Sequence, residues 1–333
     1  MSNNSPTQGS ADMVGKQILS IICPVYNEQD NIMMFYGRIK NVMSTLQDEY
    51  DCELIFTNNR SVDNTLNILQ NLHEQDPHVK ILTLSRNFGY QASVLAGLSY
   101  AIGDASVVID VDCEDPPELL LEFVERWKQG YEVVYGIRTK RPEPAVVQWM
   151  RNLFYQLLQR TGDNPVILNM AEFALIDQQV RHEILRNKST FPFLRTEIGF
   201  AGFNRMGIPY ERQARQHGKT HYNFLGMTAF AIGGILSSST YLLRLSAFLG
   251  GALLPLNLIL LVTDMAGIAS KALDLLIGLD LMYLVFFLAV LSVYNARIYH
   301  NTVHRPVFIV DWKLSTLLPP EQVSMPRKAE ILS

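Results

Sequence analysis

The amino-acid sequence predicts an α/β fold with a mostly parallel sheet, helices on both of its faces, and an apolar helical hairpin after it. From residue 17 to about residue 222, short aliphatic runs alternate with longer stretches of helical periodicity, at the spacing of βαβ units. Polar residues follow each apolar run, and the carboxyl ends of parallel strands share one edge of a sheet. From about residue 223 the chain is strongly apolar instead, which predicts contact with a membrane.

Five buried strands, with helices between them, are expected from these patterns. The strand at Val107–Asp112 is the clearest, because its first three residues are β-branched and suit burial on both faces. Asp63 is placed to cap the helix that ends near Gln75. The other strands are expected at Ile18–Cys23, Glu53–Thr57, Val79–Ser85 and Glu132–Ile137. The other helices are expected at Asp30–Leu46, from Gln91 to about Ile102, at Pro117–Gln129 and at Val146–Arg160.

The composition excludes some classes of protein. The 333 residues include 28 Lys and Arg against 32 Asp and Glu, a net charge of −4, so no bulk attraction to nucleic acid is expected. The three cysteines are scattered, which argues against a disulfide framework and favours a reducing compartment. Residues 1–16 are polar and lack the apolar stretch of a signal peptide, so we expect a disordered amino terminus and a cytoplasmic domain.

Two carboxylates, one residue apart, end the fourth expected strand. Side chains alternate along a strand, so Asp110 and Asp112 are expected to face the same way and to converge on one ion. Mg²⁺ usually bridges one or two carboxylates to substrate phosphates, and open α/β sheets bind ligands at the carboxyl ends of their strands. The alternative is a solvated acidic turn, because Glu114 and Asp115 follow before Pro116 stops the strand.

Five motifs, in order, resemble those of inverting family 2 glycosyltransferases with the GT-A fold. They are Pro24–Glu28 (PVYNE), Asn58–Thr65, Ser85–Gln91 (SRNFGYQ), Asp110–Glu118 (DVDCEDPPE) and Tyr135–Arg138 (YGIR). The sequence is most similar to the polyprenyl-phosphate subgroup, which includes dolichol-phosphate mannose synthase and bacterial enzymes that make undecaprenyl-phosphate glucose. The resemblance covers about residues 18–310 and implies a Rossmann-like GT-A domain at residues 17–222.

The resemblance also implies roles for individual residues. A Mg²⁺ or Mn²⁺ ion is expected on Asp110, Asp112 and Glu114, the last of which replaces a common Gln. The expected nucleotide-sugar contacts are Pro24, Tyr26, Glu28, Asn58, Arg86, Asn87, Gln91 and Asp110. The expected contacts to the acceptor phosphate are Arg138, Arg151, Arg212, Lys219 and His221. The residues expected to be catalytic are Asp112, Glu172 and Arg215.

Some of these positions depart from the family pattern. Asn58 and Asn59 replace residues that are usually acidic or small; an amide can still bind uracil, although a plain strand-end turn is the alternative for Asn58. Glu172 stands where relatives carry an Asp that organises the acceptor, and a Glu on a loop is its alternative. His221 replaces a Lys in the basic segment 212–222, which closes over the donor diphosphate in relatives or holds anionic lipid.

The apolar part of the chain predicts an interfacial helix and two membrane spans. Residues 223–243 are apolar and rich in small residues, which suits a helix at the membrane interface. Within residues 244–300, the stretches 245–263 and 275–294 are each long enough to cross a bilayer. A long hairpin in the core of a soluble protein is the alternative.

Basic residues predict which side of the membrane the hairpin ends lie on. Arg244 precedes the hairpin, and Arg297 and Arg305 follow it, so the positive-inside rule places both ends in the cytoplasm. Residues 301–333 are then a cytoplasmic segment, of which 311–333 is expected to be a loose tail.

The resemblance, together with the expected membrane hairpin, implies metal-dependent, inverting transfer of a sugar from a nucleotide-sugar to a polyprenyl phosphate at the inner membrane. A UDP-sugar of glucose type and undecaprenyl phosphate are favoured, for cell-envelope glycan or O-antigen modification. A phosphate acceptor is already an anion at neutral pH, so catalysis is expected to depend on positioning and charge stabilisation. Two other classes stay open: a processive polysaccharide synthase, which normally has more spans, and a non-catalytic membrane scaffold. Assembly into a homo-oligomer also stays open.

Overall fold

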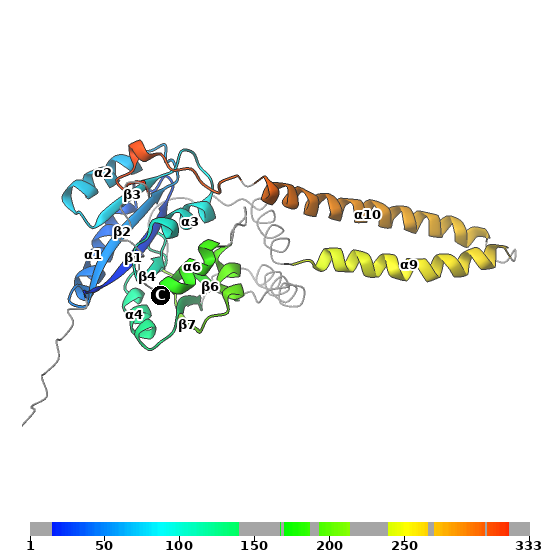
Figure 1. The fold of residues 1–333 in the computed structure, drawn as a ribbon, viewed down its shortest axis with the longest axis horizontal. Helices are drawn as coiled ribbons and strands as arrows, with labels where there is room; N and C mark the ends of the chain where they lie inside the picture. Colours follow the sequence, from blue (N-terminus) through cyan, green and yellow to red (C-terminus); the bar gives the residue numbers. More distant parts are fainter. Residues whose placement is uncertain are drawn as a thin grey trace, which may run out of the picture.

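The computed structural model describes residues 15–139, 167, 170–186, 193–213, 239–265, 270–303 and 305–319. A seven-stranded sheet lies between layers of helices, and a long helical hairpin extends away from this domain (Figure 1). The strands are β1 (Gln17–Val25), β2 (Tyr50–Asn58), β3 (Val79–Thr83), β4 (Ala105–Val108), β5 (Val133–Arg138), β6 (Met170–Asp177) and β7 (Arg205–Tyr210). The helices are α1 (Ile32–Leu46), α2 (Thr65–Gln75), α3 (Tyr90–Tyr100), α4 (Leu119–Lys128), α6 (Gln178–Arg186), α7 (Leu194–Ala201), α9 (Tyr241–Met265), α10 (Ser270–Thr302) and the 3-10 helix η1 (Trp312–Leu314).

The strand order in the sheet is β3-β2-β1-β4-β6-β5-β7. The first four strands pair in parallel, β6 is antiparallel to both of its neighbours, and β5 pairs with β7 in parallel. The prediction of a mostly parallel α/β sheet is therefore confirmed. Because β6 alone is reversed, one edge of the sheet, which we call the rim, collects six carboxyl-terminal strand ends and the amino-terminal end of β6.

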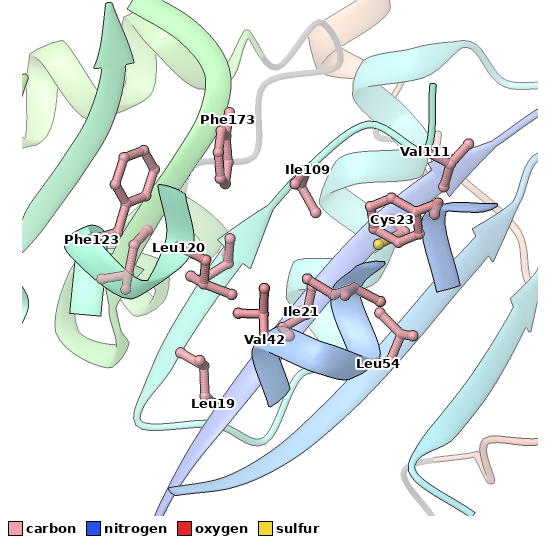
Figure 2. Close-up of a cluster of buried hydrophobic side chains, with 14 of the residues drawn as sticks. Leu19, Ile21, Cys23, Val42, Leu54, Ile109, Val111, Leu120, Phe123 and Phe173 are labelled. Atoms are coloured by element: carbon pink, nitrogen blue, oxygen red, sulfur yellow. The ribbon is translucent and has the colours of Figure 1, made fainter. Parts of the chain in front are cut away.

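The core has two halves, one on each face of the sheet. Leu19, Ile21 and Cys23 of β1 pack with buried residues of α1, α2 and α4 in the cluster that Figure 2 shows. The intervening Ile22 faces the other side, where α3, α6 and α7 cover the sheet. Helix and sheet approach each other closely at Gly97 in α3, where a Cβ atom would lie 2.3 Å from Ile22 Cγ2. Both faces are thus buried, which explains why these strands read as continuous apolar runs.

The structure departs from the sequence prediction in three respects that concern the site and the sheet. β4 ends at Val108, not at Asp112, so the acidic residues follow the strand. The cap position of α2 is occupied by Asn64 and not by Asp63. The Asp63 carboxylate accepts a hydrogen bond from Thr65 N, in the first residue of the helix, at 3.0 Å. β6 and β7 were not expected as strands, because their segments lie beyond the regular βα alternation.

The hairpin consists of α9 and α10, which run side by side away from the domain (Figure 1). The stretches Tyr241–Thr263 and Leu276–Thr302 are long and apolar enough to cross a membrane, with mean hydropathies of 2.2 and 2.4. Little of either stretch is buried, unlike the core helices of a soluble protein. The Tyr283 hydroxyl donates to Ser246 O at 2.9 Å and holds the two helices together. Both predicted spans therefore correspond to helices that leave an apolar surface exposed.

Residues 305–319, which we call the edge segment, return from α10 to the sheet. They lie along β3, the edge strand, where an antiparallel bridge joins Leu84 to Val310. Thr83 O accepts a hydrogen bond from Asp311 N at 2.8 Å, and Ile81 O accepts one from Thr316 N at 2.9 Å. The prediction of a loose tail from residue 311 is therefore wrong for residues 311–319, because the unpaired backbone groups of an edge strand bind this segment.

Candidate active site

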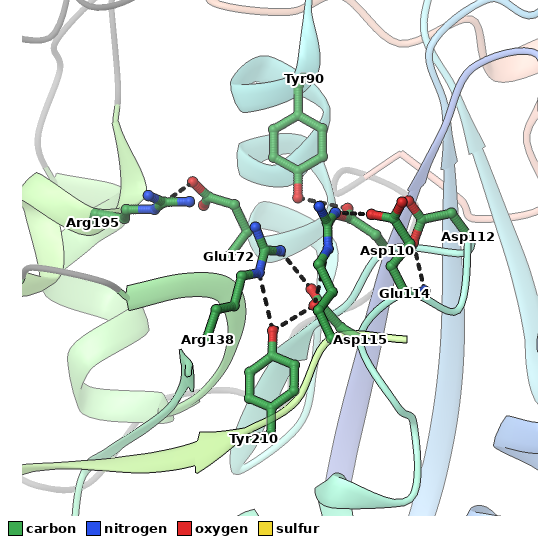
Figure 3. Close-up of polar contacts among 10 residues, drawn as sticks. Tyr90, Asp110, Asp112, Glu114, Asp115, Arg138, Glu172, Arg195 and Tyr210 are labelled. Atoms are coloured by element: carbon green, nitrogen blue, oxygen red, sulfur yellow. Dashed lines mark hydrogen bonds and ion pairs between the residues drawn. The ribbon is translucent and has the colours of Figure 1, made fainter. Parts of the chain in front are cut away.

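The loop after β4 brings four acidic side chains to the rim (Figure 3). Ile109 N still donates to Ile22 O at 3.0 Å, but the chain then turns, and Cys113 adopts a positive φ of 55°. Asp110 and Asp112 lie in this loop and not on a strand. Strand alternation therefore does not set the direction of these two side chains, as was expected. A turn shapes the acidic loop instead, in which Asp112 Oδ1 accepts a hydrogen bond from Glu114 N at 3.0 Å.

Asp110 is surrounded by negative charge. The Tyr90 hydroxyl, from the first residue of α3, donates to Asp110 Oδ1 at 2.7 Å. Burial, together with the carboxylates of Asp112 and Asp115, raises the pKa of Asp110 to about 7. Burial and Asp110 also raise the pKa of Tyr90 well above its ordinary value. A positive charge placed beside Asp110 would relieve this repulsion.

Asp115 fastens the acidic loop to the ends of two strands. The residue is 1% exposed, and its Oδ2 accepts from Arg138 Nη2 at 2.8 Å. Its Oδ1 accepts from the Tyr210 hydroxyl, which also accepts from Arg138 Nε at 3.1 Å (Figure 3). Arg138 ends β5 and Tyr210 ends β7, so one buried carboxylate links three segments at the rim. The expected contact of Arg138 with an acceptor phosphate stays a prediction, since Asp115 holds its guanidinium.

Glu114, the third expected metal ligand, forms an ion pair with Arg212. Gln213 N also donates to Glu114 O at 2.8 Å. Arg212 Nε lies 3.9 Å from Asp115 Oδ1, so the guanidinium sits between two carboxylates of the acidic loop. This places a cation of the protein itself against the residue that was expected to bind a metal.

Glu172 lies on the rim because β6 runs in reverse and its amino-terminal residues face the acidic loop. It is 9% exposed, and its Oε1 lies 2.8 Å from Arg195 Nε of α7 (Figure 3). Its Oε2 has no hydrogen-bond partner among the residues that the structure describes. The alternative of a Glu on a loop is therefore wrong. Arg195 was not predicted, since it belongs to none of the motifs.

Three asparagines form a second polar group where β2 and β3 end. Asn58 ends β2, and its Oδ1 accepts from Ser61 N at 3.0 Å. Asn59 Nδ2 donates to Asn87 Oδ1 at 3.0 Å, and its Oδ1 accepts from Phe88 N at 2.9 Å. The structure thus brings together two expected nucleotide-sugar contacts, Asn58 and Asn87, through the intervening Asn59.

Most of the remaining expected nucleotide-sugar contacts lie at or near the same rim. Pro24 is buried near the end of β1, and Tyr26 just beyond it is 38% exposed. Glu28 Oε2 accepts from Asn31 Nδ2 at 2.5 Å at the start of α1. Arg86 is exposed and stacks on Phe88 with its guanidinium carbon 3.9 Å from the ring centroid. Gln91 faces α7 instead, where its Oε1 accepts from Leu194 N at 3.2 Å.

The side chains of the acidic loop fit a divalent cation only in part. No group of three or more Asp, Glu, His or Cys side chains converges as a metal site within the described ranges. Asp110 and Asp112 supply the one or two carboxylates with which Mg²⁺ is usually held when substrate phosphates complete its shell. Burial first, and then the neighbouring carboxylates, raise the pKa of Asp110, so a cation beside it would stabilise its charged form. The donor set therefore suits a hard cation that arrives with a phosphate ligand.

Four expected residues, Arg151, Arg215, Lys219 and His221, lie outside the described residues. The site also contains four residues that the motifs do not predict, namely Tyr90, Asp115, Arg195 and Tyr210. Tyr90 and Asp115 stand inside motifs already singled out, so a search for partners of the acidic pair would have found them. Arg195 and Tyr210 carry no local signal, because their partners are distant in sequence.

Comparisons with known proteins identify the family of this chain. The Glycosyl transferase family 2 model matches residues 20–185. The uncharacterized glycosyltransferase YkcC of Bacillus subtilis (strain 168) is 37% identical over 300 residues, covering 87% of this chain and 92% of that protein. A bactoprenol glucosyl transferase of Shigella phage SfV is 28% identical over 309 residues, covering 88% and 97%. Glucosyl-3-phosphoglycerate synthase from Mycobacterium tuberculosis, solved in complex with Mn²⁺, UDP-glucose and glycerol 3-phosphate, aligns with a TM-score of 0.42 at 16% identity, covering 65% and 76%.

The strand order and the polar residues at the rim define an α/β domain whose polar side chains gather where its parallel strands end. The chain belongs to glycosyltransferase family 2, and its sheet is mixed and mostly parallel.

Proposed function

We propose that the protein transfers a sugar from a nucleotide-sugar to the phosphate of a membrane polyprenol, with inversion at the anomeric carbon. A UDP-sugar of glucose type is the favoured donor, undecaprenyl phosphate the favoured acceptor, and Mg²⁺ or Mn²⁺ the cofactor. The bactoprenol glucosyl transferase of Shigella phage SfV supports the lipid acceptor. The domain would work on the cytoplasmic face of the inner membrane, and its product would serve cell-envelope glycan or O-antigen modification.

One observation carries this proposal: the chain that leaves the membrane hairpin meets the sheet at the rim. α10 ends at Thr302, and Ile309 O accepts a hydrogen bond from Ser85 N, just past the carboxyl end of β3, at 2.8 Å. Seven residues span at most roughly 25 Å, so the end of the hairpin and the rim lie on the same side of the domain. β3 and β4 are three strands apart, roughly 15 Å. A lipid phosphate at headgroup level would therefore be within reach of the acidic loop.

For this reaction the protein mainly has to orient the two substrates and to neutralise the charge of the leaving group. A phosphate monoester oxygen attacks the anomeric carbon in line with the departing nucleotide, and no strong base is needed because the acceptor is already an anion. A divalent cation, when bound, neutralises the charge of the leaving diphosphate. Asp110 and Asp112 would hold it. Arg212 can bind phosphate oxygens bidentately, and Glu172, oriented by Arg195, would position a hydroxyl of the sugar or the acceptor.

The test is transfer by the purified full-length protein. It is incubated in detergent with labelled UDP-glucose, other UDP-sugars or GDP-mannose, undecaprenyl phosphate and Mg²⁺ or Mn²⁺, and the lipid fraction is extracted. We expect a labelled lipid with one sugar, and no transfer by Asp112→Ala. Asp51→Ala is the matched control, since Asp51 is an exposed carboxylate at the amino-terminal end of β2 and should leave transfer unchanged.

Each other outcome rejects the proposal. Normal transfer by Asp112→Ala would remove the acidic loop from the mechanism. Metal-dependent binding of UDP without transfer to lipid by any donor would favour a non-catalytic scaffold. A long polymer as product would identify a processive synthase.

A further inference from the structure

The edge segment satisfies the outward backbone groups of β3 almost completely. Ile81 N donates to Thr316 Oγ1 at 2.8 Å, Thr83 N donates to Ser315 Oγ at 2.9 Å, and the Thr83 hydroxyl donates to Leu314 O at 2.8 Å. Together with the bonds of Asp311 N, Thr316 N and Ser85 N, these contacts run from the rim toward the other end of the strand. The segment is therefore a built part of the sheet edge.

Aromatic packing holds the same segment to α3. Phe308 and Trp312 both contact Tyr100, with ring centroids 6.4 Å and 5.5 Å apart. Val310 and Leu317 pack against the core on this face of the sheet. Backbone pairing with β3 and apolar contacts with α3 thus fix the position of residues 308–317, which include Asp311.

Asp311 connects the edge segment to the loop that follows β2. Its Oδ2 lies 2.9 Å from Arg60 Nη1, and its Oδ1 accepts from Lys313 N at 3.2 Å. Arg60 has a positive φ of 63°, a conformation that a residue with a side chain rarely adopts without support. It stands between Asn59 and Ser61, the two residues whose contacts order the asparagine group at the rim.

We propose that Asp311 is a positioning residue: through Arg60, it fixes the turn formed by residues 58–61, where the nucleotide part of the donor is expected. This inference rests on the proposed function for its kinetic consequence. The end of the membrane hairpin is thereby coupled to the donor site by 305–319, with Asp311 as the ionic contact between them. The pair is partly exposed, at 44% for the Arg60 side chain and 26% for Asp311, so the expected effect is moderate.

The experiment compares Asp311→Asn with the wild-type full-length protein in detergent. We expect the KM for the nucleotide-sugar to rise about threefold to fivefold with kcat nearly unchanged, because an exposed ion pair contributes little and acts on donor binding alone. Asp311→Glu, which keeps the charge, should recover most of the effect. Glu183→Gln is the matched control, since it breaks a comparable exposed pair with Arg186 on α6, 3.0 Å long, away from the turn.

A second measurement needs no activity and separates the two proposals. Amide hydrogen exchange at Ser61, whose N–H is bound by Asn58, should speed up about threefold or more in Asp311→Asn and in Arg60→Gln, and stay unchanged in Glu183→Gln. Faster exchange in a protein that transfers no sugar would uphold the structural coupling and reject the proposed function. Unchanged exchange, or a fall in kcat with KM constant, would overturn the inference about Asp311.

Discussion

Replacing Asp115 with Asn is expected to destabilise the domain more than any change to an exposed charge. Asp115 is 1% exposed, and the Arg138 side chain that it binds is 12% exposed, so the substitution leaves a buried guanidinium without its counter-charge. Removing one partner of a buried pair costs about 3–5 kcal/mol. Asn can still accept from Tyr210, so we expect the low end, about 3 kcal/mol.

For a domain of this size, about 3 kcal/mol corresponds to a fall in Tm of roughly 6–12 °C. The assay is thermal unfolding of the full-length protein in detergent, at one heating rate for all variants. Glu122→Gln is the matched control: it removes an exposed carboxylate 3.4 Å from Arg126 and should change stability by less than about 0.5 kcal/mol.

A double substitution tests the cause. Asp115→Asn combined with Arg138→Met removes the unpaired charge and should recover part of the lost stability. The reasoning is refuted if Asp115→Asn unfolds at the same temperature as Glu122→Gln, or if Arg138→Met in the Asn background only adds further loss.

Three other results are expected. Arg212→Gln frees Glu114, so Mn²⁺ alone, titrated by electron paramagnetic resonance, should bind about threefold to fivefold more tightly; weaker binding would contradict this. Burial opposes ionisation of Asp76, but hydrogen bonds from neighbours including His78 lower its pKa to about 2. Because this folded pKa lies below the ordinary value, Asp76→Asn should cost about 2 kcal/mol at pH 7 and progressively less as the pH falls from about 4 toward 2, measured by unfolding; a pH-independent loss would refute the assignment. Gly97→Ala forces a Cβ into the sheet and should destabilise by about 1–3 kcal/mol in the same assay, whereas an unchanged Tm would show that α3 shifts freely.

The sheet and its rim could be predicted because each parallel strand can be recognised from its own local sequence. Runs such as Ile18–Cys23 are apolar on both faces, and the polar residues after them share the rim whatever the strand order. The hairpin could be predicted from the length of its uncharged stretches alone.

The reversed strand β6 could not be predicted, because apolar periodicity carries no information on strand direction. Met170–Ile176 is buried throughout, yet only pairing with β4 and β5 shows that its first residues face the rim. The same limit applies to the end of β4: Val111 continues the apolar alternation, but it packs into the core from a turn. Glu172 and the acidic loop thus meet through tertiary structure alone.

The other wrong or incomplete predictions concern residues whose contacts are distant in sequence. Arg138 reads as a free cation for phosphate, and only the fold shows Asp115 against it. Residues 311–319 read as a tail because they contain no long apolar run; their docking depends on the backbone groups that β3 leaves open.

The covered edge of β3 has a consequence for how the chain matures on the ribosome. The strands of the sheet are synthesised first, then both apolar helices, and the residues that close the edge emerge only after these helices. Until they do, the newly made domain presents the amide groups of Ile81 and Thr83 to any passing strand. Completion of the sheet domain therefore waits until α9 and α10 have been synthesised, and a polypeptide cut short after β7 would tend to aggregate.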